Sequence, residues 1–349
     1  MSGNSASISL LRLDPISRKT LRYALGMVVM FAVVFTYNWP AAFLVILIGN
    51  GFLLGSKPTL KSAFEYVYKM TLAWLIAVLI SYLFLDYYII YLLVIALIML
   101  HIYYADSSVL SPLLKVFMCI MNMLVPLMSL KSPALGATLG SLLLIGSIGA
   151  LLLSSVLFAL IPDIEVPADQ ATAAPAPPAP KPSKQERFGL AIRSLAVLFP
   201  LLLLFFFFNM QSDVLILVYI SLFAAMPGFA KDLSIGKMMV RTTLIGGLVA
   251  FFMYEILVII PMFSFFMLMV FGLALFAGYQ LFTSGKYAIT IKKGWSAIIF
   301  IFGGAANSID VDLEGKVLTR TAQMVFLVIY LVVAFKILEK FFPQTKKSN

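Results

Sequence analysis

The sequence predicts an all-helical integral membrane protein with about twelve transmembrane helices, arranged as two parallel six-helix repeats. Three observations carry this prediction. First, 62% of the 349 residues are hydrophobic and 11% are charged, which is more apolar surface than a soluble domain of this size can bury. Second, apolar runs long enough to span a bilayer recur along the chain. Third, both halves open with the same basic-then-apolar pattern on either side of a Pro- and Ala-rich stretch.

The expected spans follow one another with short polar turns between them. In the first half they cover residues 21–37, 40–54, 64–85, 87–104, 113–130 and 135–161. In the second half they cover residues 190–208, 214–229, 238–260, 262–282, 294–306 and 322–342. The chain therefore divides into an N-terminal tail (1–19), a first membrane repeat (20–162), a linker (163–187), a second membrane repeat (188–342) and a C-terminal tail (343–349).

The net charge of +10 indicates membrane topology and not a nucleic-acid partner, because Lys and Arg gather in every second loop. The intervening turns hold acidic residues such as Asp86, Asp213 and Asp310, with few basic exceptions. The positive-inside rule then places both tails and the linker in the cytoplasm. The polar N-terminus lacks a cleavage site after the first apolar run, so we expect no cleaved signal peptide. The basic residues that set this topology include Arg12, Arg18, Lys19, Arg22, Lys57, Lys61, Lys181, Lys184, Arg187 and Arg193.

An internal repeat is indicated by two alignments of the halves. An offset of 171 residues brings Arg22 onto Arg193, and an offset of 172 brings Lys69-Met-Thr-Leu onto Arg241-Thr-Thr-Leu. Six spans per half is an even number, so the second half enters the membrane in the same orientation as the first. Chance similarity between basic-flanked apolar segments is the alternative explanation.

The sequence predicts that the segment between the halves is an extended linker. Residues 166–187 contain many prolines and alanines and few large apolar side chains. Such a segment favours extended polyproline geometry and cannot form a packed unit. Its prolines also permit a role as a ligand for a signalling domain.

Two corresponding pairs of spans are short or interrupted by Gly and Pro, and repeat-built transporters place substrate sites at such interruptions. The fifth span pairs with the eleventh, and the second span, with its Gly-Asn-Gly sequence, pairs with the eighth. Close helix packing at glycines and helix ends at prolines are the alternative explanation. The candidate substrate path comprises small or polar residues of these spans: Asn50, Asn122, Pro126, Gly303, Gly304 and Asn307.

Lys69 and Arg241 occupy equivalent places a few residues inside the third and ninth spans, near the cytoplasmic side. A charged side chain at membrane depth is costly, so each one is a candidate for a functional role. The two cations could form an entrance that attracts anionic substrates, or they could reach out to lipid phosphates.

Three titratable groups are candidates for proton coupling. His101 lies near the inner end of the fourth span and precedes Asp106, and Glu255 lies near the outer end of the ninth. The pKa of histidine lies close to physiological pH, and burial raises the pKa of a glutamate. Simple solvation at the interface is the alternative for each.

The residue inventory argues against a metal site, a cofactor and enzymatic activity. Cys119 is the only cysteine and His101 the only histidine, so an intramolecular disulfide and a multi-cysteine metal site are excluded. No phosphate loop, G-x-S-x-G elbow or HExxH helix is present. An enzyme of this sequence would have to work inside the bilayer.

The start of the ninth span carries a resemblance to a known family. Arg241-Thr-Thr-Leu-Ile-Gly246-Gly247, which follows a Pro227-Gly228 turn and a basic loop, resembles the corresponding segment of the fusaric acid resistance and aromatic acid exporter superfamily. Lys69-Met-Thr-Leu-Ala-Trp74 is a weaker copy, with Lys for Arg and Trp for Gly. The six-span blocks resemble the family's membrane module over nearly the whole chain, and the absence of a large cytoplasmic domain resembles its short, membrane-only branch.

This resemblance implies an exporter in the bacterial inner membrane. Its substrates would be small amphiphilic organic anions or drugs, and a periplasmic membrane fusion (adaptor) protein would be the partner. Proton drive is the further hypothesis, and a homo-oligomer is compatible with the sequence. Two alternatives stay open: a non-transporting membrane scaffold of an envelope complex, and an intramembrane enzyme on lipid-linked substrates.

Overall fold

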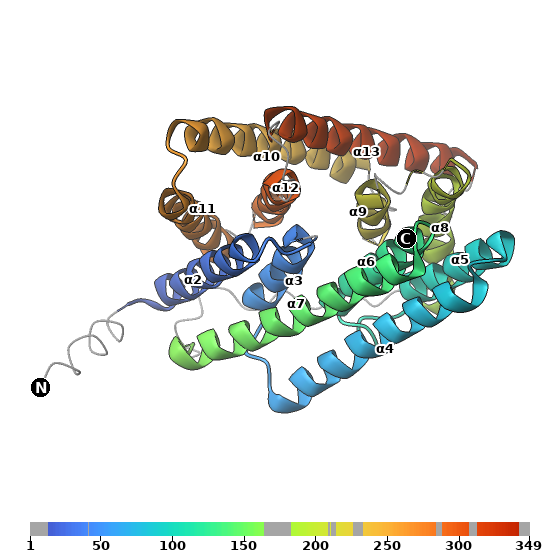
Figure 1. Ribbon diagram of the computed structural model, residues 1–349, viewed down its shortest axis with the longest axis horizontal. Helices are drawn as coiled ribbons and strands as arrows, with labels where there is room; N and C mark the ends of the chain where they lie inside the picture. Colours follow the sequence, from blue (N-terminus) through green and yellow to red (C-terminus); the bar gives the residue numbers. More distant parts are fainter. Residues whose placement is uncertain are drawn as a thin grey trace, which may run out of the picture.

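The computed structural model describes residues 13–40, 42–163, 183–208, 210, 214–225, 233–283, 288–306 and 313–341. All the regular secondary structure in these ranges is α-helical (Figure 1). The helices of the first half are α2 (Pro15–Thr36), α3 (Ala42–Leu54), α4 (Leu60–Phe84), α5 (Tyr88–Tyr104), α6 (Pro112–Ser129) and α7 (Pro133–Leu160). Those of the second half are α8 (Lys184–Phe207), α9 (Val214–Ala224), α10 (Leu233–Ile259), α11 (Phe263–Thr283), α12 (Ala288–Ala306) and α13 (Leu313–Phe341).

Seven helices of the described residues are long and apolar enough to cross a membrane. They are Pro15–Thr36, Leu60–Phe84, Pro112–Ser129, Pro133–Leu160, Lys184–Phe207, Arg241–Ile259 and Phe263–Thr283. Shorter apolar helices lie at Ala42–Leu54, Tyr88–Tyr104 and Val325–Leu338. An all-helical, multi-pass membrane protein fits these helices, and twelve crossings stay a prediction from the sequence.

Several helices begin earlier than the apolar pattern predicts, and polar caps explain the early start of α2 and α8. Asp14 caps the first turn of α2 by accepting a hydrogen bond from the backbone N–H of Ser17 at 3.3 Å, and Pro15 follows at the first helical position. Ser183 and Glu186 form a reciprocal capping box at the start of α8. Residues 184–187, which the sequence placed in the linker, are therefore the first turn of α8, whereas residues 164–182 lie outside the described ranges.

The helices lie in four layers, which Figure 1 shows stacked from top to bottom. Helices α10 and α13 form one outer layer, and α4 and α7 form the other. Between them, a row of α11, α12, α9 and α8 faces a row of α2, α3, α6 and α5. The contacts α2–α11, α3–α12, α6–α9 and α5–α8 join the two rows and so join the two halves of the chain.

Contacts within one half correspond to contacts within the other. The pairs α2–α3, α3–α7, α4–α6, α4–α7 and α6–α7 match α8–α9, α9–α13, α10–α12, α10–α13 and α12–α13. Contacts between the halves match in the same way, with α5–α8 corresponding to α11–α2 and α6–α9 to α12–α3. This is the pattern that a two-fold exchange of the halves would produce.

The surface of the bundle is apolar, as a lipid-facing surface must be. Phe64 in α4 is 74% exposed, Phe207 at the end of α8 73% and Ile259 at the end of α10 77%. Helix α6, in contrast, is among the most buried helices of the structure, and its apolar side chains pack inside the bundle. An apolar exterior and a buried α6 indicate that α6 is an interior helix with bilayer as the outer solvent.

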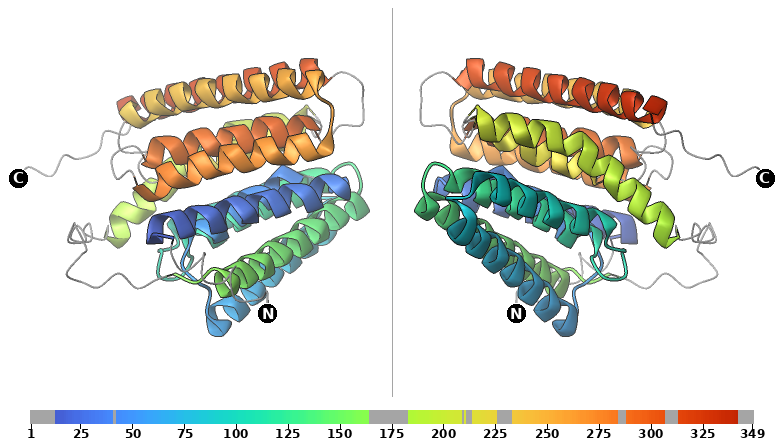
Figure 2. Two further views of the ribbon diagram at one scale, coloured as in Figure 1. Left: turned by 90° about the vertical axis from the view of Figure 1, so that its left-hand side faces the viewer. Right: turned by 90° about the vertical axis from the view of Figure 1, so that its right-hand side faces the viewer.

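Both halves begin and end at the same end of the bundle. In Figure 2 the starts of α2 and α8 and the ends of α7 and α13 all lie at one end. This arrangement agrees with an even number of passes in each half.

Candidate functional site

Eight helices form the seam between the halves, and the four in its middle, α3, α6, α9 and α12, are those that the sequence singled out as short or interrupted. Helices α3 and α9 have 13 and 11 residues, so each is only about 15 to 20 Å long at 1.5 Å per residue, against a hydrocarbon core of about 30 Å. They meet α12 and α6 respectively, and α3 also contacts α6. The ring of Phe300 in α12 packs edge-on against Phe43 of α3 at 5.2 Å and against Tyr219 of α9. The seam therefore brings together α3, α9 and α12 directly.

Asn50 lies in this region and takes part in a buried polar contact. Its side chain is 3% exposed, and its Oδ1 accepts a hydrogen bond of 2.6 Å from the hydroxyl of Tyr23 in α2. The Tyr23 ring packs edge-on against Phe282 of α11, and the indole of Trp295 in α12 lies beside its hydroxyl. Four helices from both halves thus meet around one buried polar pair.

Asn122 lies in α6 with 4% of its surface exposed. Its Nδ2 donates to the carbonyl of Met118 at 2.9 Å, one turn earlier in the same helix. Pro126, one turn later, has no N–H, so it cannot supply the helical donor that the carbonyl of Asn122 would otherwise receive. A side-chain amide and a freed backbone carbonyl therefore lie together in the interior of the bundle.

A second tyrosine fixes the end of α6 just beyond this interruption. The hydroxyl of Tyr91 in α5 donates to the carbonyl of Pro126 at 3.0 Å and lies 2.8 Å from the Ser81 Oγ of α4. Ser129 donates back to the carbonyl of Val125 at 2.8 Å. Hydroxyl groups thus satisfy carbonyls in the last turn of α6. The bond from Tyr91 also joins this proline-containing helix to α5.

The remaining predicted path residues are placed less completely. Gly303 and Gly304 lie near the end of α12, the helix that packs on α3. Asn307 lies outside the described residues. The predicted pairing of Pro126 with the two glycines therefore stays a prediction from the sequence.

Lys69 and Arg241 occur at matching positions in α4 and α10, but their surroundings differ. The Lys69 ammonium group forms an ion pair with Glu65 one turn earlier, at 2.5 Å, and also donates to the carbonyl of Val109 at 3.1 Å. Arg241 is exposed. In this conformation the carboxylate of Glu65, at the protein surface, balances the charge of Lys69. This pairing weakens the attraction of Lys69 for an external anion.

The three proton-coupling candidates do not gather in one place. His101 is an exposed residue in the last turn of α5, and Glu255 is half-buried in α10. Asp106 accepts hydrogen bonds from Ser107 and Ser108, and its carboxylate lies 3.4 Å from the Arg187 guanidinium of α8. Asp106 therefore ties the loop after α5 to the start of α8.

Arg18 and Arg22 mark the topology in the sequence, and Arg22 also marks the repeat, but both are buried side chains. Arg22 donates to the carbonyl of Ile161 at 2.9 Å and to the Asp163 carboxylate at 3.0 Å, and its guanidinium lies 3.7 Å from the centre of the Phe158 ring. Their spacing of four residues, which places both on one helix face, was the signal that could have revealed a local role.

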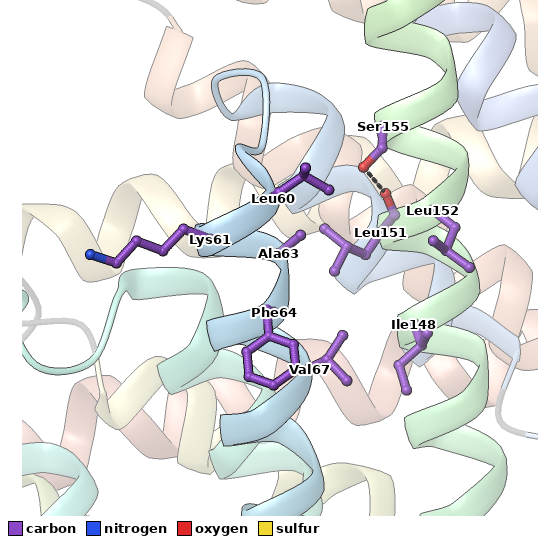
Figure 3. Close-up of a pocket in the computed structure, with 9 residues that line it drawn as sticks. All are labelled: Leu60, Lys61, Ala63, Phe64, Val67, Ile148, Leu151, Leu152 and Ser155. Carbon is purple, nitrogen blue, oxygen red and sulfur yellow. Dashed lines mark hydrogen bonds between the residues drawn. The ribbon is translucent and has the colours of Figure 1, made fainter.

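A groove of about 630 Å³ runs between α4 and α7 (Figure 3). Its walls are mostly apolar, and Lys61 and Ser155 are its polar members. The Ser155 hydroxyl is bonded to the carbonyl of Leu151 within α7, at 2.9 Å. The groove therefore offers apolar surface and hardly any polar recognition. The apolar lining consists of Leu60, Ala63, Phe64, Val67, Ile148, Leu151 and Leu152.

No group of three metal-ligating side chains occurs among the residues that the structure describes, and Cys119 is fully buried in α6. Comparison with models of protein families, with curated proteins and with solved structures found no match. The exporter resemblance therefore rests on the sequence motifs alone.

Proposed function

We propose that the chain is a secondary exporter of small amphiphilic organic anions or drugs in the bacterial inner membrane. In this proposal it crosses the membrane twelve times, in two parallel six-helix repeats, with both tails and the linker in the cytoplasm. Support for the repeat comes from the contact pattern, in which each seam contact of one half has a counterpart in the other. A periplasmic adaptor protein as partner follows from the family resemblance.

One observation carries the transport proposal: the interrupted helices of both halves converge at the seam between the halves. Transporters built from repeats place the substrate there, because freed backbone groups can line a cavity between two bodies that rock against each other. Asn50 and the Asn122–Pro126 segment supply buried polar groups in two of these helices.

The proposed cycle moves the halves against each other about this seam and draws on the proton gradient. Of the candidates, Glu255 is half-buried in α10 and His101 is exposed at the end of α5. The seam contacts α3–α12 and α6–α9 lie at the pivot, whereas the α2–α11 and α5–α8 contacts lie toward the two edges of the rows.

The test is uptake of a labelled aromatic carboxylate into inverted membrane vesicles that contain the chain, with and without collapse of the proton gradient. Asn122→Leu should reduce transport at least tenfold while the protein stays folded, because it removes a polar group from the path. Ser141→Ala is the matched control, because Ser141 in α7 only bonds to the carbonyl of Ala137 in its own helix. Transport by Asn122→Leu at the control rate would contradict the assigned path, and transport by none of the proteins would favour the scaffold.

A further inference from the structure

A pair of arginines one helical turn apart lies buried near the start of α2. Arg18 is 6% exposed and Arg22 3% exposed, and the Nε of each has no hydrogen-bond partner. Arg22 is partly satisfied through its Nη1, which contacts Ile161 and Asp163. Within the ranges described above, the side chain of Arg18 forms neither a hydrogen bond nor an ion pair.

The charges at this site do not balance. Two guanidinium groups four residues apart repel each other on one helix face, and among the described residues the one carboxylate that pairs with either is that of Asp163, through Arg22. A buried cation without a partner costs several kcal/mol. Buried donors that lack an acceptor therefore point to a missing anion.

We propose that Arg18 and Arg22 bind the carboxylate of the exported compound at the cytoplasmic end of the first half. This inference rests on the proposed function and identifies the substrate class as a carboxylate-bearing amphiphile. A guanidinium presents parallel N–H groups that fit a carboxylate in a bidentate pair. The ring of Phe158, which already contacts Arg22, supplies apolar surface beside the bound group.

The missing counter-ion favours this site over Lys69. Arg18 is the fourth residue of α2, about 5 Å from the start of the helix at 1.5 Å per residue, so the proposed site lies near the end of the bundle. Lys69 already has Glu65 as its counter-ion. Asp163, in turn, is 40% exposed next to the linker and acts as a built-in competitor that an incoming carboxylate displaces from Arg22.

The experiment measures the thermal midpoint of the full chain in phosphatidylcholine nanodiscs during a benzoate titration at constant ionic strength. Wild type should gain about 2–4 °C at ten times its Kd. Arg18→Gln should weaken benzoate binding about tenfold to hundredfold, and Arg18→Lys should fall between the two. Lys19→Gln is the matched control, because it removes a neighbouring cation of the same turn that is half-buried. Asp163→Asn should tighten benzoate binding.

Each outcome decides the proposal. Equal benzoate responses of wild type and Arg18→Gln would overturn it, and so would weaker binding by Asp163→Asn. A second set of nanodiscs contains phosphatidylglycerol: stabilisation by this lipid through Arg18, with no response to benzoate, would assign the site to lipid phosphate and overturn the carboxylate. Benzoate binding through Arg18 without transport in vesicles would leave the site standing and refute export.

Discussion

Gly136 and Gly140 set the distance between α7 and the interior helix α6, so a methyl group at Gly136 should separate the two helices. The residues form a Gly-x-x-x-Gly sequence, which places both glycines on one helix face. A Cβ added at Gly136 would lie 2.1 Å from the Ser129 Oγ, 2.6 Å from the carbonyl oxygen of Val125 and 2.9 Å from the Ser129 backbone nitrogen. Two of these three atoms belong to the backbone of α6, and a change of rotamer cannot move them away.

The expected cost follows from these distances. A normal carbon–oxygen contact needs about 3.2 Å or more, so the two backbones must move apart by roughly half an ångström. Overpacking of this kind costs about 1–3 kcal/mol of unfolding free energy. The last turn of α6 would move with it, including the carbonyl that Tyr91 holds.

Gly149 provides a control in the same helix, because a Cβ there meets nothing within 4 Å. Gly149→Ala should leave the stability unchanged or raise it by up to about 1 kcal/mol, since alanine favours a helix over glycine. The assay is unfolding of the two variants in identical detergent or nanodiscs, followed by tryptophan fluorescence. If Gly136→Ala unfolds at the same point as Gly149→Ala, the close approach of α6 and α7 is not what the structure describes.

Three hydrogen-bond and ion-pair substitutions should rank by burial in the same assay. Tyr91→Phe should cost about 1–2 kcal/mol, because it leaves the carbonyl of a buried helix end unpaired; no loss of stability would argue against this contact. Arg22→Gln should cost about 2–4 kcal/mol, because Asp163, the carbonyl of Ile161 and the ring of Phe158 all lose the buried guanidinium. A double-mutant cycle with Asp163→Asn should return a coupling energy of at least 0.5 kcal/mol. Asp106→Asn should cost no more than about 1 kcal/mol, because the Arg187–Asp106 pair is partly exposed; a cost as large as that of Arg22→Gln would contradict this ranking.

Apolar run length predicted where the helices lie, because each element must satisfy its own backbone in lipid. Caps such as Ser183–Glu186 shifted the boundaries, since a polar first turn is invisible to a hydropathy pattern. The alignment of the halves pointed to α3, α6, α9 and α12 through their glycines and prolines, and these helices form the middle of the seam between the halves. Helix interruptions by glycine or proline can therefore be predicted from sequence when they occur at corresponding positions in the two halves.

The partners of individual side chains were not readable in the same way. Lys69 was selected because Arg241 matches it, yet Glu65, four residues earlier on the same helix face, balances its charge. A search for carboxylates at a spacing of four would have found this pair. Arg22 meets Asp163 across 141 residues of chain, a contact that no local pattern encodes. Tyr23 and Tyr91, similarly, look like ordinary interfacial aromatics until Asn50 and Pro126 are placed beside them.

The contacts that join the halves differ between the two edges of the rows, which bears on the proposed movement of the halves. The α5–α8 edge combines the partly exposed Arg187–Asp106 ion pair with edge-on contacts of Tyr104 with Phe188 and of Tyr91 with Phe206. The matching α2–α11 edge is held by aromatic packing, with Tyr23 on Phe282 and Phe31 on Phe266. A partly exposed ion pair is worth at most about 1 kcal/mol, and an aromatic pair contributes about 0.5–1.5 kcal/mol beyond its buried area. Helix packing that is matched between the halves therefore goes with different side-chain contacts at the two edges, and in the proposed cycle the two edges need not open equally.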